Sequence, residues 1–344
     1  MLAAVFQGIE KICVEQVPDP EILDPEDIIV RTEAMAICGS DLHVFFGRES
    51  GLDAGTVMGH EFVGEVVAKG KAVQRIPLRA RVMVPFTTSC GRCDLCRRGL
   101  TARCLHGQLF GWVQNGRGLH GGQAGLVRVP HADTTVLPLH DLSARDGLLL
   151  GDILATGYHC ARQGITPGMR QAILIGYGPV GMMVAASARY LGVEQLLVVD
   201  ADIKRRRMAL DHGFQAYAPE DKPQLLEHSL GLGYSAVLEA VGGPGPQSLA
   251  YDLVRAGGVI SSVGVHTTEH FSFSPVQAYD KNITYRSGRC PARYYMPLLR
   301  RLLTEEKIRM PEVFSHTFPL NQAPEAYHLF AYRPEPVMKI SLSV

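Results

Sequence analysis

The chain has 344 residues, which is more than a single hydrophobic core usually holds, so we expect two domains. Lysine plus arginine and aspartate plus glutamate each number 34, and this balance gives no indication of a nucleic acid or an anionic membrane as partner. The first residues lack the cationic start of a signal peptide, and no window approaches about eighteen uninterrupted apolar residues. The sequence therefore predicts a cytoplasmic protein without a membrane span.

The first part of the chain, residues 1–150, consists of short strand-like runs separated by glycine and proline. Three of these runs lie at 28–37, 64–70 and 125–130, and each is rich in valine, isoleucine or other apolar residues. This pattern is typical of an irregular, mainly β domain.

The middle part, residues 151–287, changes to an alternation of strands and helices. An apolar run at 172–176 is followed by a glycine-rich turn, a helical stretch and a second apolar run that ends at Asp200. The alternation continues to a predicted helix at 246–258 and a predicted strand at 259–265. The β-α-β order predicts a doubly wound parallel sheet.

The last part, residues 288–344, returns to a mixed pattern. We predict helices at 294–307 and 323–332 and a final strand at 336–344. We expect this part to rejoin residues 1–150, so that the parallel-sheet domain is inserted into the mainly β domain. The predicted fold class is therefore α/β with two domains.

Four cysteines stand at C-x2-C-x2-C-x7-C within fifteen residues. They are Cys90, Cys93, Cys96 and Cys104. The short x2 spacings let a tight turn aim successive sulfurs at one point, and Zn²⁺ binds four thiolates tetrahedrally. Disulfides and unrelated buried thiols are the alternatives, and this density in a chain of eight cysteines disfavours both. Four protein ligands close the site, so the sequence predicts a structural zinc.

A G-x-G-x-x-G motif at Gly176, Gly178 and Gly181 follows a predicted strand and opens a predicted helix. In that context the motif predicts a dinucleotide site, with the pyrophosphate at the helix N-terminus. Asp200 ends the next strand, where a carboxylate accepts hydrogen bonds from a ribose and repels a 2′-phosphate, so NAD is favoured. The basic run 204–207 leaves NADP as the alternative, although such a run is also typical of a solvated helix face.

A second metal site is indicated by residues that lie far apart in the sequence. Cys38 and His60 offer a thiolate and an imidazole, which are good Zn²⁺ ligands, and Asp152 precedes a predicted helix. Each also has a plain structural interpretation, as a small core residue, a histidine in a turn and an N-cap. Thr156, four residues after Asp152, shares its helical face and is a candidate contact of the nicotinamide.

Four motifs in this order resemble those of the zinc-dependent medium-chain dehydrogenase/reductase family, which includes the alcohol dehydrogenases. They are C-G-S-D-L-H over 38–43, G-H-E-x2-G-x5-G-x2-V over 59–73, the four-cysteine lobe and the glycine motif. The resemblance covers nearly the whole chain. It implies a GroES-like catalytic domain and a Rossmann nucleotide domain. An aspartate at position 152 is similar to the bacterial formaldehyde-dehydrogenase-like branch.

The resemblance also implies roles for single residues. Cys38, His60 and Asp152 would bind a catalytic zinc with one open position, and Asp41 would hold the His60 ring. Catalytic roles are implied for Ser40, His43 and Glu61, the first two as a proton relay. Nucleotide contacts are implied for Thr156, Gly176, Gly178, Pro179, Val180, Gly181, Asp200, Arg205, Val263, Gly264, Val265 and Lys339, the last at the pyrophosphate.

Aromatic residues supply a candidate substrate pocket. Phe86 matches a pocket position of the family, and Phe110 and Trp112 are further candidates; ordinary core packing is the alternative for each. One departure lies at 79–82, where the family often has Gly-Asp-Arg-Val and this chain reads Arg-Ala-Arg-Val, so we expect a different turn.

The sequence thus predicts an NAD-dependent alcohol dehydrogenase with one catalytic and one structural zinc per subunit. It would interconvert a primary or secondary alcohol and an aldehyde or ketone, with no nucleic acid or membrane as partner. Polyol-, threonine- or formaldehyde-type dehydrogenases are the alternatives within the family, and a zinc-ribbon-like binding module is the alternative from another class. A homo-oligomer, tetramer or dimer, is expected from the resemblance. The resemblance also implies that strand 259–265 is the sheet edge that pairs two nucleotide domains.

Overall fold

The computed structural model describes residues 1–332 and 337–344, and the chain divides into two compact units. The first comprises Met1–Ala155, Pro291–Thr304 and Glu312–Val344, and the second comprises Thr156–Cys290 and Glu305–Pro311. The sequence boundaries were expected at 150/151 and 287/288. The short segment Glu305–Pro311, which we expected in the mainly β domain, belongs to the second unit.

The first unit contains a small sheet, a large mixed sheet and a two-stranded sheet in which β7 pairs with β8. The small sheet has the order β2-β1-β4; the large one has the order β10-β6-β5-β3-β18-β17, and β9 also pairs with β3. The strands are β1 (Leu2–Gly8), β2 (Lys11–Gln16), β3 (Ile28–Ile37), β4 (Thr56–Val57), β5 (Glu61–Lys69), β6 (Arg81–Val84), β7 (Trp112–Gln114), β8 (Arg117–Leu119), β9 (Leu126–Val129), β10 (Leu137–Pro138), β17 (Phe314–Pro319) and β18 (Lys339–Ser343).

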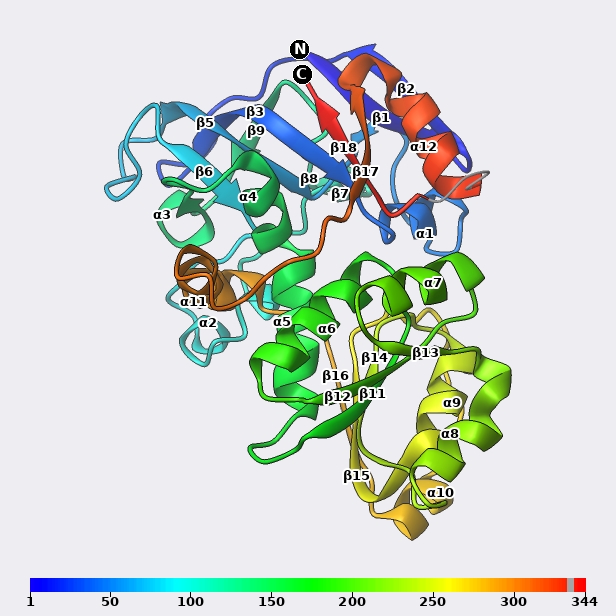
Figure 1. Cartoon of the computed structure of the whole chain (residues 1–344). Coiled ribbons are helices and arrows are strands. Elements are labelled where there is room, and N and C mark those ends of the chain that lie inside the picture. Colours follow the sequence, from blue (N-terminus) through cyan, green and yellow to red (C-terminus); the bar gives the residue numbers. More distant parts are fainter. Residues whose placement is uncertain (333–336) are drawn as a thin grey trace. The chain divides into compact units, whose positions relative to one another are not determined.

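Both ends of the chain build the large sheet. The C-terminal strand β18 pairs antiparallel with β3, and in Figure 1 the red strand lies beside the blue one. The apolar residues of β3, such as Ile28, Val30 and Met35, are fully buried in the core of this unit. Pro336, where we predicted the last strand to start, lies outside the described residues.

Short helices complete the first unit. They are α1 (Asp41–Phe45), α2 (Asp94–Arg97), α3 (Ala132–Thr135), α4 (Ala144–Gly151), α11 (Ala292–Thr304) and α12 (Ala323–Tyr332). Helix α4 begins with a capping box, in which Ser143 accepts from the Asp146 amide and the Asp146 carboxylate accepts from the Ser143 amide. It ends at Gly151, so Asp152 stands between α4 and the next helix.

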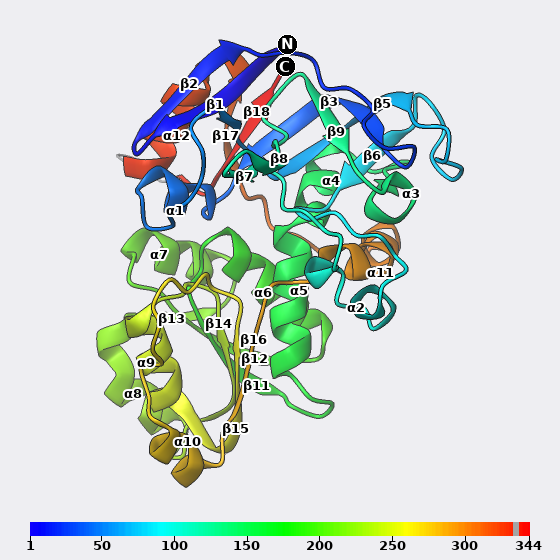
Figure 2. The ribbon, with the colours of Figure 1, turned by 180° about the vertical axis from the view of Figure 1, so that it is seen from behind.

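The second unit is a six-stranded parallel sheet with the order β13-β12-β11-β14-β15-β16. Figures 1 and 2 show α5 on one face of the sheet and α8 and α9 on the other, which is the doubly wound arrangement. The strands are β11 (Gln171–Ile175), β12 (Gln195–Val199), β13 (Gln215–Tyr217), β14 (Tyr234–Glu239), β15 (Val254–Ser262) and β16 (Thr284–Ser287). The helices are α5 (Ile153–Gly164), α6 (Pro179–Tyr190), α7 (Ile203–Asp211), α8 (Lys222–His228), α9 (Pro244–Leu253) and α10 (Pro275–Lys281).

Two predictions about this sheet were wrong. The helix predicted at 246–258 ends at Leu253, because Val254 already pairs with Tyr234 in the sheet. The strand predicted at the edge is flanked on both sides, since β15 pairs with β14 and β16. The edge is β16, whose polar sequence Thr-Tyr-Arg-Ser gave no strand signal.

Among the described residues, no helix combines the length and the hydropathy that crossing a bilayer requires.

Candidate metal and nucleotide sites

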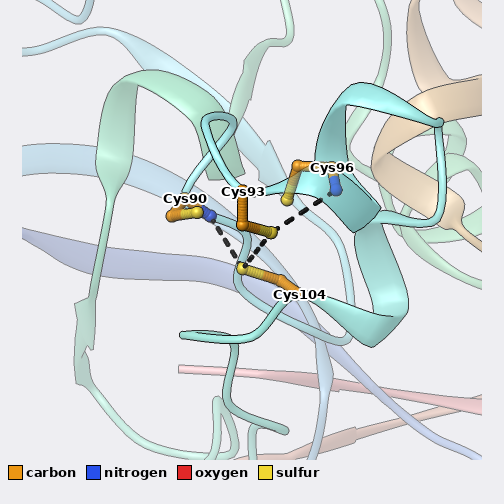
Figure 3. Close-up of side chains that lie close together, drawn as sticks. All are labelled: Cys90, Cys93, Cys96 and Cys104. Carbon is orange, nitrogen blue, oxygen red and sulfur yellow. Dashed lines mark hydrogen bonds between the residues drawn. The ribbon is translucent and has the colours of Figure 1, made fainter.

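The four cysteines of the lobe come together in the first unit (Figure 3). Their sulfurs all lie within 4.8 Å of one another. The Sγ atoms of Cys93 and Cys104 are 3.9 Å apart, close to the edge of about 3.8 Å that a tetrahedron with 2.3 Å metal–sulfur bonds would have. The four-sulfur donor set fits a closed zinc site.

Backbone amides point at these sulfurs. The amides of Cys90 and His106 donate to the Cys104 sulfur, at 3.2 and 3.4 Å, and the Cys96 amide donates to the Cys93 sulfur at 3.5 Å. Hydrogen bonds from the backbone at Leu105 and Cys96 lower the pKa of Cys93 to about 6, whereas burial raises the pKa of Cys104. Amide donors favour thiolates, which are the form that binds metal.

The lobe is tied to the rest of the unit by polar contacts. Arg92 pairs with Glu26 at 2.8 Å, and the same carboxylate lies 2.6 Å from the Nδ1 atom of His131. The Ser89 hydroxyl donates to the Thr134 carbonyl at 3.1 Å. These contacts hold the loop through side chains other than the four cysteines, so none of them occupies a cysteine sulfur.

A second cluster gathers Cys38, His60, Glu61 and Asp152 within 4.8 Å. Cys38 directly follows β3, His60 directly precedes β5, and Asp152 stands at the break between α4 and α5. The Sγ atom of Cys38 lies 3.5 Å from Asp152 Oδ2, and His60 Nε2 lies 3.4 Å from the same oxygen. Three segments far apart in sequence therefore present a sulfur, a nitrogen and an oxygen to one point.

Asp41 sets the orientation of two of these groups. Its Oδ1 atom lies 3.1 Å from His60 Nδ1, and its Oδ2 atom accepts from the Cys38 amide at 2.9 Å. Because Nδ1 is held in this way, Nε2 is the ring atom that faces the cluster. The support that we expected from Asp41 is present in the structure.

The charges of the second cluster are buried and strongly perturbed. Burial, with the Asp152 carboxylate, raises the pKa of Cys38. Burial opposes protonation of His60, but Asp41 and Asp152 outweigh it and raise the pKa of His60 well above its usual value. Despite burial, the hydrogen bond with His60 lowers the pKa of Asp152.

Glu61 is the fourth member of this cluster, and Lys339 is its partner. The Lys339 ammonium lies 2.7 Å from both carboxylate oxygens, and the two side chains are 1% and 0% exposed. Burial raises the pKa of Glu61 to about 7, against the opposing charge of Lys339. The Lys339 ammonium is thus engaged by Glu61 inside the first unit. The pyrophosphate contact expected of Lys339 stays a prediction.

The donor set of the second cluster fits a catalytic type of zinc site. Thiolate, imidazole and carboxylate are all zinc ligands, and three protein ligands leave a position for a substrate atom. A thiol and two carboxylates crowd together with one imidazole and one ammonium, and a divalent cation would offset the charge that burial penalises. The residues present therefore fit the metal.

Other predicted site residues lie around His60. The Ser40 hydroxyl is 3.3 Å from Nε2 of His60, and the Phe86 ring stands edge-on to the imidazole with centroids 6.5 Å apart. The Nδ1 atom of His43 is buried without a hydrogen-bond partner in the described part of the chain, and burial lowers the pKa of His43. A neutral His43 with a free ring nitrogen is able to accept a proton.

Two aromatic candidates for the pocket pack into the protein instead. Phe110 is 1% exposed, stands edge-on to Phe62 at 5.0 Å and belongs to the hydrophobic core. Trp112 is half-buried against the same core. The structure thus favours core packing for Phe110, the alternative that the sequence left open.

In the second unit, the glycine motif forms a narrow turn between β11 and α6. Gly176 has φ +92°, and a Cβ on Gly181 would lie 1.9 Å from the Gly176 carbonyl oxygen, so both positions require glycine. Pro179 opens α6 directly after Gly178. A glycine turn that opens a helix fits the predicted nucleotide, because a pyrophosphate binds at such a helix N-terminus.

Asp200 and Arg205 flank that turn. Asp200 Oδ2 accepts from the Tyr177 amide at 2.7 Å, and Oδ1 accepts from the Asp202 amide at 2.8 Å. Arg205 Nη1 lies 3.9 Å from Asp200 Oδ2 and faces Gly178. The carboxylate is therefore held by backbone amides at the end of β12, where a ribose would be recognised.

The sequence did not single out Glu239, which is buried at the end of β14. Its carboxylate accepts from the amides of Val241 and Gly242, both at 2.6 Å, and from Ser262. The available signal was a carboxylate that closes the apolar run Ala-Val-Leu-Glu, since a buried charge at a strand end needs dedicated partners.

Comparisons with known proteins agree with this geometry. Residues 24–141 match the family described as "Alcohol dehydrogenase GroES-like domain", and residues 179–305 match "Zinc-binding dehydrogenase". The chain is 37% identical over 342 residues to "Zinc-type alcohol dehydrogenase B" of Aspergillus flavus, covering 96% of this chain and 78% of that protein. It is 32% identical over 376 residues to "Glutathione-independent formaldehyde dehydrogenase" of Pseudomonas aeruginosa, covering 95% and 94%.

Among solved structures, the chain is similar to an alcohol dehydrogenase from Thermus sp. ATN1. The TM-score is 0.93 at 35% identity, and the alignment covers 100% of both chains.

Proposed function

Because the chain belongs to the zinc-dependent medium-chain dehydrogenase family, we propose that it is an NAD-dependent alcohol dehydrogenase acting on a primary or secondary alcohol. The observation that carries the proposal is the buried convergence of Cys38, His60 and Asp152, three different zinc ligands with Ser40 beside them. A zinc-ribbon-like module would need only the four-cysteine lobe. Such a module would not require the second cluster or the nucleotide unit.

The chain's own residues carry the proton chemistry. Zinc held by Cys38, His60 and Asp152 would supply the Lewis acidity that makes an alcohol proton labile near neutral pH. We propose that Ser40, 3.3 Å from His60 Nε2, accepts that proton, and that His43, whose Nδ1 atom is buried without a partner among the described residues, passes it on. A bound nicotinamide would supply the hydride acceptor for alcohol oxidation and the hydride donor for the reverse reaction.

Glu61 and Lys339 determine the charge next to Cys38, His60 and Asp152. Their buried ion pair supplies one carboxylate within ligand distance of the cluster and one cation that balances it. We propose that Glu61 would be a further carboxylate available to hold the metal beside Cys38, His60 and Asp152, and that Lys339 balances its charge.

The held carboxylate of Asp200 supports NAD over NADP. A 2′-phosphate would meet its negative charge, whereas ribose hydroxyls would donate to it. Arg205, 3.9 Å away, offers the counter-argument, since a guanidinium binds phosphate well. We propose NAD as the preferred nucleotide.

A formaldehyde-type dehydrogenase is the second candidate, and the Pseudomonas aeruginosa relative supports it. It would use the same ligands and differ in the substrate pocket. We also propose a cytoplasmic homo-oligomer, a tetramer or a dimer, which light scattering on the purified protein would decide.

The test is a panel of primary alcohols, secondary alcohols, polyols, threonine and formaldehyde, each assayed with NAD⁺ and NADP⁺ on protein of measured zinc content. We expect two zinc ions per chain, turnover of simple alcohols, and a preference for NAD⁺. A protein with full zinc that oxidises none of these substrates, and that fails to enhance NADH fluorescence, would contradict the proposal.

A further inference from the structure

A chain of three hydrogen-bonded side chains closes the second unit at the carboxyl ends of β14 and β15. Ser262 donates to Glu239 Oε2 at 2.5 Å, and the Ser262 hydroxyl lies 2.8 Å from Nε2 of His266. Nδ1 of His266 accepts from the Gly243 amide at 3.3 Å. We call Glu239, Ser262 and His266 the strand-end network.

The hydrogen bonds of the network agree with one assignment of donors and acceptors. Nδ1 of His266 accepts the Gly243 amide proton, and the tautomer that does so carries its own proton on Nε2. Nε2–H therefore donates to the Ser262 oxygen, which leaves the Ser262 proton for Glu239. The remaining carboxylate oxygen takes the amides of Val241 and Gly242. Each of the three side chains is thus satisfied in this arrangement.

This arrangement clamps two loops against each other, backbone to backbone. A Cβ on Gly264 would lie 2.0 Å from the Gly242 amide nitrogen, and a Cβ on Gly242 would lie 2.2 Å from the Val265 carbonyl oxygen. The Val263 amide donates to the Glu239 carbonyl at 2.9 Å. The backbone of 263–265 is consequently held from the side of β14 and, through His266, from its own C-terminal end.

We propose that Glu239, Ser262 and His266 are positioning residues for nucleotide binding: they hold the 263–265 backbone in the conformation that receives the nucleotide. The inference rests on the proposed function, because it concerns the same nucleotide. In doubly wound sheets, nucleotides bind at the carboxyl ends of the parallel strands, which is where this network lies. None of the three touches the reacting atoms in this assignment.

The burial of these polar side chains distinguishes the positioning role from ordinary apolar packing. Glu239 and Ser262 are 1% and 2% exposed, and buried polar side chains that hydrogen-bond one another cost more than an apolar pair of similar volume. Such a network specifies one backbone conformation at the expense of stability. His266, 22% exposed, is the accessible end of the network.

The experiment separates the two hydrogen bonds of His266, one with the Gly243 amide and one with the Ser262 hydroxyl. The variant His266→Asn keeps an acceptor for the Gly243 amide, but its side chain is too short to contact Ser262. The variant His266→Gln keeps a side chain long enough to contact Ser262. The variant His266→Ala loses both contacts. We expect His266→Ala and Ser262→Ala to raise the Kd for NADH about tenfold, with His266→Gln closer to the parent than His266→Asn. The Michaelis constant for NAD⁺ should rise with Kd, while kcat at saturating NAD⁺ stays within about twofold.

Two matched controls identify a merely structural effect. His270 is exposed, lies in the same loop and makes no side-chain hydrogen bond among the described residues, so His270→Asn should leave the Kd unchanged. Ser261, the neighbour of Ser262 on β15, donates to the Cys160 carbonyl at 2.8 Å, so Ser261→Ala removes a buried hydroxyl bond outside the network. It should lower the melting temperature as Ser262→Ala does, without changing the Kd.

Equal NADH affinity in the parent, His266→Ala and Ser262→Ala would overturn the inference and leave the proposed function intact. A parent protein that does not bind NADH would overturn the proposed function and this role with it. On the unmodified protein, ¹⁵N signals of His266 should report the Nε2–H tautomer and should shift when NADH binds. Signals that do not respond to NADH would also contradict the positioning role.

Discussion

The two candidate metal sites of the first unit are built in opposite ways. The lobe takes four sulfurs from one stretch of fifteen residues, and backbone amides at hydrogen-bond distance surround them. The second cluster takes different donors from three segments, and Cys38 and Asp152 are 114 residues apart. A cluster that forms locally can be recognised by spacing alone, whereas the second exists only once the sheet and the break between α4 and α5 are in place.

Their surroundings differ as well. The ion pair outside the lobe, Arg92–Glu26, is exposed, while the pair under the second cluster, Glu61–Lys339, is almost completely buried. Charges in a dry interior act strongly on one another, and charges in water do so weakly. The interaction between charges is therefore strong at the second cluster and weak outside the lobe.

The largest effect is expected at the second cluster. Cys38→Ser or His60→Ala removes one of three zinc ligands, and we expect alcohol oxidation to fall by at least about 10³-fold because Lewis-acid activation is lost. The nucleotide unit is a separate segment, so NADH should still bind. Steady-state assays, zinc analysis and NADH fluorescence check this.

Cys13→Ser is the matched control, because Cys13 lies in β2 and belongs to neither cluster. It should behave as the parent protein. If Cys38→Ser retained near-normal turnover, the assignment of the catalytic ligands would be wrong.

The next effect is expected at the lobe. Cys104→Ser or Cys93→Ser should remove one zinc per chain and lower the melting temperature by about ten degrees or more, because a closed metal site contributes directly to folding. The fraction that remains folded should turn over alcohol at nearly the parent rate per catalytic zinc. Calorimetry and active-site titration measure the two quantities separately, and a fully stable, assembled but inactive variant would contradict the structural role.

The sequence predicted the two-unit fold and the lobe because both depend on local signals. The β-α alternation and the cysteine spacing need only a few neighbouring residues. It missed what depends on tertiary pairing: the edge strand β16 is polar, and Val254 leaves the helical pattern because Tyr234 pairs with it. The pairing of Lys339 with Glu61 joins residues 278 apart, and no spacing rule reaches that far.

The turn at Arg79 shows a different limit. The family often has glycine there, and we expected the turn to change. Arg79 adopts φ +64°, the left-handed conformation that glycine favours, at a cost of roughly 1 kcal/mol. The difference from the family's turn stays a prediction.

A smaller effect than loss of a ligand is expected when the buried ion pair is broken. Lys339→Met leaves the Glu61 carboxylate buried without its cation, and we expect the free energy of unfolding to fall by about 3–5 kcal/mol. The double variant Lys339→Met/Glu61→Gln should recover part of this loss, because it removes the uncompensated charge. Urea unfolding of the single and double variants measures the coupling, and additive effects would show that the pair does not act as a unit.

The smallest effect is expected at the exposed pair beside the lobe. The Arg92 guanidinium is 65% exposed, so water screens its attraction to Glu26, and holding both long side chains in one geometry costs entropy. Arg92→Gln should therefore leave the melting temperature and the zinc content unchanged, although the same 2.8 Å contact looks as close as the buried one. A clear loss of zinc would mean that the lobe depends on its outer contacts. The lobe would then not differ from the second cluster in being independent of neighbouring charges.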